Sequence, residues 1–248
     1  MMPHRYWAAA RAPRYSLVFA LPLLLLYEGL SFGMTGSAFA GVRNGADVLL
    51  KTAFVALGGR HGLALFSLAL LGIGGWLVWR DRRRHPGPLR RAVFLGMLGE
   101  SLVYAALLGT VVSTLTGLLL RPPLLVVQGT QPVALAFGAQ LVVSLGAGIY
   151  EELLFRVLLV SGFTAGGLAL GWSRGASVAV AVIGSALVFS AFHYIGPLGD
   201  TWALPSFTFR AIAGALLSGL YVARGFGITA WTHALYDVGL ALVGIHST

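Results

Sequence analysis

The chain contains no cysteine, which excludes disulfide bridges, zinc–thiolate sites and cysteine nucleophiles. Charged residues are also scarce: they make up 10% of the 248 residues, whereas 57% are hydrophobic, and the mean hydropathy is +0.84. A soluble globular domain has about 25% charged residues. The composition therefore predicts an integral membrane protein.

Lysine is almost absent as well, with Lys51 as the single example, while arginine, alanine, glycine and leucine are abundant. This bias indicates a GC-rich genome, and we expect a prokaryotic plasma membrane as the location. A net charge of +9 would suggest a nucleic-acid partner in a soluble protein, but here the basic residues cluster between apolar stretches. We therefore expect the lipid bilayer, and no nucleic acid, as a partner.

Long apolar stretches recur along the chain, and about 20 apolar residues suffice to cross a bilayer as a helix. They predict an all-α fold, a polytopic transmembrane helix bundle that forms a single integral-membrane domain over residues 1–248. We expect eight helices, or seven if residues 133–170 form one long helix. The predicted spans are residues 16–33, 61–79, 92–119, 133–150, 153–170, 176–195, 207–223 and 227–245.

The most basic segment lies between the second and third predicted spans. This segment, "RDRRRHPGPLRR" at residues 80–91, carries six arginines around a Pro-Gly-Pro turn, a pattern typical of a loop. The positive-inside rule assigns such a loop to the cytoplasm, and two crossings put the arginine-bearing N-terminus on the same side. We therefore expect a multi-pass protein with a cytoplasmic N-terminus.

Only eight residues are acidic, and five of them fall in or beside apolar spans. A charged side chain near the bilayer centre costs on the order of 3 kcal/mol on insertion scales. Each of the five therefore needs a partner, a water-filled cavity or a function. The five are Glu28, Glu100, Glu151, Glu152 and Asp237.

Two of these glutamates are adjacent in the apolar stretch "GIYEELLFRVLL", residues 148–159. Glu152 and Arg156 are four residues apart and can form an ion pair on one face of a helix. Glu151 is rotated from that face by about 100° and has no such partner. From these residues alone, a structural network between helices and a catalytic carboxylate both remain open.

Histidines occur in two further apolar segments. "FSAFH" places His193 at the end of a span, and "HALYD" places His233 and Asp237 one turn apart on another helix. A lone buried histidine is usually a hydrogen-bonding group and nothing more. Together with a glutamate, however, these side chains supply what water activation requires: a carboxylate base, an imidazole that holds the proton and donors for an oxyanion.

These three motifs, in this order, resemble those of the CAAX prenyl protease and bacteriocin-processing (CPBP) family of glutamic-type intramembrane proteases. "EELLFR" fits the family's EExxxR, "FSAFH" fits FxxxH, and "HALYD" fits HxxxN or HxxxD, all within residues 148–240. The resemblance implies an intramembrane endopeptidase without a cofactor, acting on a peptide or membrane-protein substrate, prenylated or not. It also implies that Glu152 and Arg156 brace the site.

The resemblance further implies that Glu151 and His193 activate water, while His233 and Asp237 bind the developing oxyanion. The prenyl-protease branch typically has asparagine where this chain has Asp237. An ionised aspartate cannot donate a hydrogen bond. Asp237 would therefore be protonated, or it would orient the ring of His233 so that the imidazole is the donor.

Two other functions remain open from the residues. A glutamate and two histidines can bind zinc with an open position for water, which would make the chain a zinc-dependent membrane protease, although the HExxH spacing is absent. The same polar groups could instead serve a non-catalytic transporter or scaffold. The inverted repeats and paired broken helices of many transporters are not found in the sequence.

Overall fold

The computed structural model of the chain describes residues 3–34, 42–120, 137–196 and 199–244. Every regular element within these ranges is helical, which confirms the predicted all-α fold. If helices that follow one another without a break are counted together, these ranges contain eight helical segments. The predicted span residues 133–136 and 245 lie outside the described ranges.

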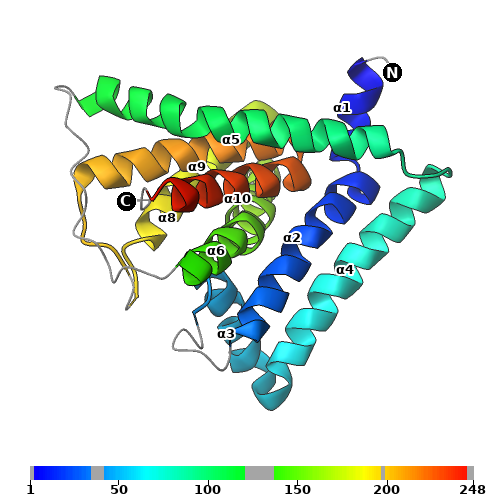
Figure 1. Ribbon diagram of the computed structural model, residues 1–248. Helices are drawn as coiled ribbons and strands as arrows, with labels where there is room; N and C mark the ends of the chain where they lie inside the picture. Colours follow the sequence, from blue (N-terminus) through cyan, green and yellow to red (C-terminus); the bar gives the residue numbers. More distant parts are fainter. Residues whose placement is uncertain (1–2, 35–41, 121–136, 197–198, 245–248) are drawn as a thin grey trace.

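The bundle consists mainly of long helices that cross one another at various angles (Figure 1). Two of the elements are not α-helices: η1 is a short 3-10 helix and η2 is a π-helix. In chain order the elements are α1 (Pro3–Arg11), α2 (Pro13–Gly33), α3 (Gly45–Gly58), η1 (Gly59–His61), α4 (Gly62–Arg84), α5 (Arg91–Leu120), α6 (Phe137–Gly146), η2 (Ala147–Val160), α7 (Ser161–Ala169), α8 (Arg174–Phe192), α9 (Leu204–Arg224) and α10 (Phe226–Val243).

Among the described residues, five helical segments are long and apolar enough to cross a membrane: α2, the α3–α4 segment, α5, α8 and α9. Their outward faces carry large aliphatic side chains such as Leu68 and Leu118, which are 70% and 69% exposed. A soluble protein rarely exposes so much continuous apolar surface, but helices that face lipid do. The chain is therefore an integral membrane protein.

Residues 133–170, for which the sequence left two spans or one helix open, form one continuous helix from Phe137 to Ala169 where they are described. The glycines of "SGFTAGG" do not interrupt it, and the break expected between residues 150 and 153 is absent. The reason is that the chain passes from α6 into η2 and back to α7 while its backbone stays hydrogen-bonded. Most π-helical segments are single turns, often at functional sites, so the 14 residues of η2 are unusual.

The α6–η2 junction and the first half of α10 are buried in the bundle, where α10 packs against α2, α5, α6, α9 and η2. Two glycines make this packing possible. A Cβ atom on Gly148 would lie 2.6 Å from the carbonyl oxygen of Ala230 in α10, and one on Gly146 would lie 2.6 Å from the ring of Tyr27 in α2. Since real Cβ contacts are longer than this, only glycine allows the junction to approach its neighbours so closely.

Each of the five acidic residues expected to need a partner has one. Glu28 pairs with Lys51 at 2.8 Å, and Glu100 accepts two hydrogen bonds from the buried Arg224, at 2.8 and 2.9 Å. These pairs join α2 to α3 and α5 to α9. The other three acidic side chains belong to the sequence motifs.

Candidate active site

The first motif brings two fully buried charges together on η2. Arg156 Nε lies 3.1 Å from Glu152 Oε2, and this confirms the predicted ion pair. The guanidinium also sits over the ring of Phe189 in α8, with Cζ 4.5 Å from the ring centroid, within the range of a cation–π contact. Arg156 thus links η2 to α8 as well as neutralising Glu152.

The second oxygen of Glu152 contacts the third motif. Its Oε1 lies 2.7 Å from His233 Nδ1, and because a carboxylate only accepts hydrogen bonds, Nδ1 is the donor. On the other side of the ring, His233 Nε2 faces Asp237 Oδ2 at 3.5 Å, the one-turn neighbour predicted from the spacing. The ring of His233 therefore lies between two carboxylates, one on η2 and one on its own helix.

Glu151, which has no partner on its own helix, has one elsewhere in the chain. Its Oε1 accepts a hydrogen bond of 2.7 Å from Asn44 Nδ2, at the N-terminus of α3. The side chain is 6% exposed, and its other oxygen, Oε2, is buried with no hydrogen-bond partner among the described residues. One oxygen is thus held by an amide while the other is available for chemistry.

His193 caps the C-terminus of α8 and is partly exposed. Its Nδ1 lies 2.8 Å from the carbonyl oxygen of Phe189, and a carbonyl only accepts, so Nδ1 carries the hydrogen. This leaves Nε2 as the acceptor nitrogen of a neutral ring. Glu151 interacts electrostatically with His193 and also with His233, so the three side chains act on one another across η2, α8 and α10.

Two further residues belong to this site: Phe189, the first residue of the FxxxH motif, to which no role was assigned, and Asn44, which the sequence analysis missed. Phe189 contacts three side chains of the site: the His193 ring at 4.8 Å between centroids, the His233 ring at 6.1 Å and the Arg156 guanidinium. The motif places Phe189 one turn before His193, but its residue type alone does not reveal that the ring contacts Arg156 and His233. Asn44 offered only its position before a helix, in an otherwise unremarkable segment.

No group of three or more His, Asp or Glu side chains within the described ranges is arranged to hold a metal ion. The two imidazoles of the motifs contact protein acceptors through Nδ1, the carboxylate of Glu152 for His233 and the backbone of Phe189 for His193.

The fold and the site together define a class, an all-α membrane protein with a polar cluster of carboxylates and imidazoles buried among its helices. Residues 132–239 match the model of the Rce1-like family, described as type II CAAX prenyl endopeptidase Rce1-like. The matched segment is similar to that protease family, which confirms the resemblance of the three motifs and supports a peptide hydrolase. No curated protein and no solved structure matches the chain.

Proposed function

We propose that the protein is an intramembrane endopeptidase that hydrolyses a peptide bond with a water molecule activated by Glu151 and His193. The observation that carries this proposal is the state of the Glu151 carboxylate: it is buried, anchored at Oε1, and receives no hydrogen bond at Oε2 from the residues that the structure describes. A general base requires an accepting atom that the protein itself does not occupy. Similarity to a protease family supplies the reaction class.

In the proposed reaction, Oε2 of Glu151 takes a proton from water as the water oxygen attacks the carbonyl carbon of the scissile bond. His193 Nε2 accepts the other hydrogen of that water and so orients it. The tetrahedral intermediate then collapses, the C–N bond breaks, and the proton held by Glu151 passes to the leaving amine. This balances the reaction, since water supplies the new carboxyl oxygen and the new amine hydrogen.

The developing oxyanion needs hydrogen-bond donors, and His233 with Asp237 is proposed to provide them. Since Nδ1 of His233 donates to Glu152, the ring can donate to an oxyanion only from Nε2, which faces Asp237 at 3.5 Å. This requires the protonated ring, which the two flanking carboxylates favour. The separation of 3.5 Å is longer than a normal hydrogen bond, so the Nε2 hydrogen is not firmly committed to Asp237. Donors fixed in place before reaction stabilise an oxyanion most effectively.

Glu152 and Arg156 are proposed to brace this arrangement. Glu152 fixes the orientation of the His233 ring, much as an outer carboxylate orients a metal-bound or catalytic histidine. Arg156 neutralises Glu152 and anchors η2 to Phe189, beside both imidazoles.

The proposed substrate is a peptide or a segment of a membrane protein. Because the family is described as a CAAX prenyl endopeptidase, prenylated CAAX peptides are one substrate class to test. We also propose a prokaryotic plasma membrane as the location, with the N-terminus and the arginine-rich segment 80–91 in the cytoplasm, from the charge distribution.

The test compares membrane peptides, by mass spectrometry of new N-termini, from cells that express the wild-type protein or Glu151→Gln. We expect products that depend on Glu151, and a quenched peptide spanning the cleaved bond, prenylated and unprenylated, to be hydrolysed by the purified wild type. Identical peptide patterns from the two strains would overturn the proposal and favour a transporter or scaffold.

A further inference from the structure

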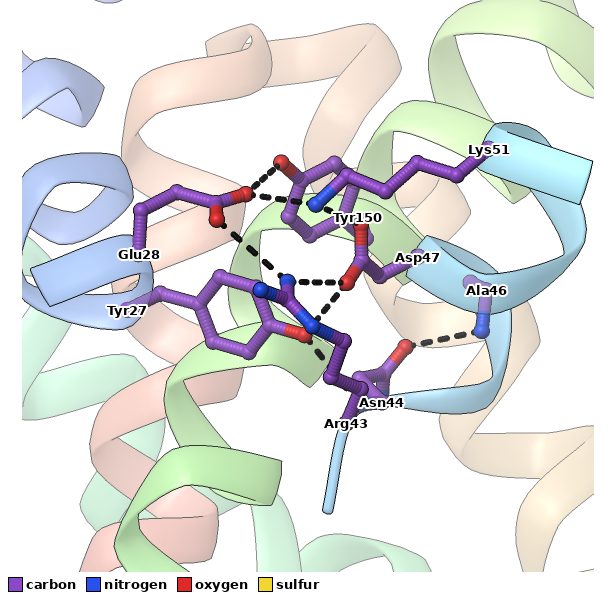
Figure 2. Close-up of polar contacts among 8 residues, drawn as sticks. All are labelled: Tyr27, Glu28, Arg43, Asn44, Ala46, Asp47, Lys51 and Tyr150. Carbon is purple, nitrogen blue, oxygen red and sulfur yellow. Dashed lines mark hydrogen bonds and ion pairs between the residues drawn. The ribbon is translucent and has the colours of Figure 1, made fainter. Parts of the chain in front are cut away.

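A cluster of polar side chains outside the three motifs lies against the start of η2 and joins it to α2 and α3 (Figure 2). Most of it comes from the part of the chain that precedes the family match. We call it the N-terminal polar cluster. Its members are Tyr27, Glu28, Arg43, Asn44, Asp47, Lys51 and Tyr150.

The charges of the cluster compensate one another. Asp47 is completely buried, yet it pairs with Lys51 at 2.7 Å and with Arg43 at 2.9 Å, and it accepts a hydrogen bond of 2.7 Å from Tyr27. Glu28 is held by the same two cations (Figure 2). Two carboxylates and two cations leave the cluster with no net charge. Because these charges are paired in a low-dielectric surrounding, where such interactions are strong, they hold the side chains of the cluster in place.

Asn44 is the member that connects this cluster to the motif glutamates. Its backbone N–H donates to the hydroxyl of Tyr27 at 3.2 Å, and its Oδ1 accepts the N–H of Ala46 at 2.9 Å, which caps α3. Its amide group has a single further function, the hydrogen bond of 2.7 Å from Nδ2 to Glu151 Oε1. Asn44 is 2% exposed, so its side chain has little freedom to adopt another orientation.

The close approach of the α6–η2 junction to the N-terminus of α3 depends on the residues at positions 146 and 44. A Cβ atom on Gly146 would lie 2.5 Å from Cβ of Asn44, so a larger residue at that position would push η2 away from the α3 cap. The glycine and the asparagine together set the distance between the cluster and Glu151.

We propose that Asn44 is a positioning residue for catalysis: it holds Oε1 of Glu151 so that Oε2 is the proton-accepting atom and faces the reacting water. The inference rests on the proposed function of Glu151 as the base. It assigns a part in the reaction to the N-terminal helices, which the three motifs and the family match do not include.

The physical consequence is a fixed carboxylate. A carboxylate with two free oxygens rotates about its last torsion and offers either oxygen in several orientations. An amide bound to one oxygen removes that freedom, and a misplacement of about 1 Å at a reacting group can cost on the order of 100-fold in rate. The Asn44 hydrogen bond also favours the ionised form of Glu151, the form that acts as a base.

Two substitutions separate the positioning role of Asn44 from its capping role. Asn44→Ser retains an oxygen that accepts the Ala46 N–H, since serine is an equally good helix cap, but it lacks the amide donor. Asn44→Asp also retains the cap and replaces the donor with a second carboxylate facing Glu151. Tyr150→Phe is the matched control, because it removes a cluster hydrogen bond, from the Tyr150 hydroxyl to Glu28, without altering Asn44.

The measurement is steady-state hydrolysis of a quenched peptide by each protein in nanodiscs, together with the melting temperature of each protein. The peptide spans a bond that is cleaved in wild-type membranes and not in Glu151→Gln membranes. We expect Asn44→Ser to melt near the wild type and Asn44→Asp to melt lower, because it adds a second buried carboxylate beside Glu151. Per folded protein, both variants should lose on the order of 10- to 100-fold in kcat with little change in KM. Tyr150→Phe should retain the wild-type kcat.

The pH profile gives a second readout that a merely structural role would not change. The titratable or charged side chains that interact with Glu151 include Arg156, His193, His233 and Asp237, and they are the same in all variants. In Asn44→Asp the added negative charge opposes ionisation of Glu151, so the acidic limb of the kcat profile should move to higher pH than in Asn44→Ser.

Three results would overturn the inference. A folded Asn44→Ser or Asn44→Asp with the wild-type kcat and pH profile would show that Asn44 does not position the base. A loss of activity that only matches the loss of folded protein would reduce Asn44 to a helix cap. Activity retained by Glu151→Gln would instead refute the proposed function on which the inference rests.

Discussion

Removal of Arg156 should destabilise the fold as well as abolish activity, because the side chain is one half of a buried ion pair. The side chains of Arg156 and Glu152 are 1% and 0% exposed, so neither charge can be solvated once its partner is gone. Breaking such a pair costs about 3–5 kcal/mol. The cation–π contact with Phe189 would be lost as well. We therefore expect Arg156→Ala to lower the free energy of unfolding by about that amount.

A companion substitution isolates the cause. Glu152→Gln removes the negative charge but retains an oxygen that accepts from His233 Nδ1. If the uncompensated charge is responsible, the double variant of Arg156→Ala with Glu152→Gln should be more stable than Arg156→Ala alone. The assay is equilibrium unfolding of the purified proteins in mixed micelles, with Glu151→Gln as the control that should fold normally. An Arg156→Ala protein that is inactive but as stable as the wild type would refute this reasoning and would assign Arg156 to catalysis instead.

Three further predictions concern the remaining parts of the site. Asp237→Asn should retain much of the activity with an altered pH profile, whereas Asp237→Ala should lose about 100-fold in kcat, or roughly 3 kcal/mol; full activity of the alanine variant across the pH range would make Asp237 purely structural. Chelation with EDTA or 1,10-phenanthroline, followed by metal analysis, should leave the cleavage rate unchanged, and a metal-dependent rate would support a zinc enzyme. Gly148→Ala should destabilise the protein by about 1–3 kcal/mol, because its Cβ would clash with Ala230. Gly138→Ala is the matched control: no atom lies within 4 Å of its new Cβ, so it should melt at or slightly above the wild-type temperature.

Contacts within one helix could be predicted from the sequence. The spacing of four residues is enough to pair Glu152 with Arg156 and to bring His233 next to Asp237, since both pairs depend only on helical periodicity. The apolar runs predicted the long helices, because the hydrocarbon core of the bilayer imposes the length and composition of a helix that crosses it.

Contacts between distant parts of the chain could not be predicted in this way. Glu152 and His233 are 81 residues apart, and Asn44 and Glu151 are 107 residues apart. No periodicity relates such positions. The sequence therefore does not reveal that His233 is the second partner of Glu152, or that Asn44 donates the only hydrogen bond found for Glu151 in the described ranges.

The geometry of η2 has a similar origin. Its residues are mostly apolar and compatible with an α-helix, so composition does not distinguish a π-helix from an α-helix. The hydrogen-bond register of a helix responds to its packing, and the two glycines at the α6–η2 junction bring this helix against α2, α3 and α10. Tertiary contacts of this kind override what a local window of sequence can indicate.

The central claim is that Glu151 is the base that activates water, and the most direct measurement is single-turnover cleavage by the purified wild type and Glu151→Gln in nanodiscs. Glutamine keeps the size of the side chain and an oxygen for the Asn44 amide, but it cannot accept the proton at the second position. We expect the variant to remain folded, to bind the peptide with similar affinity and to cleave it at least about 100-fold more slowly. A folded Glu151→Gln protein that cleaves at the wild-type rate would contradict the account.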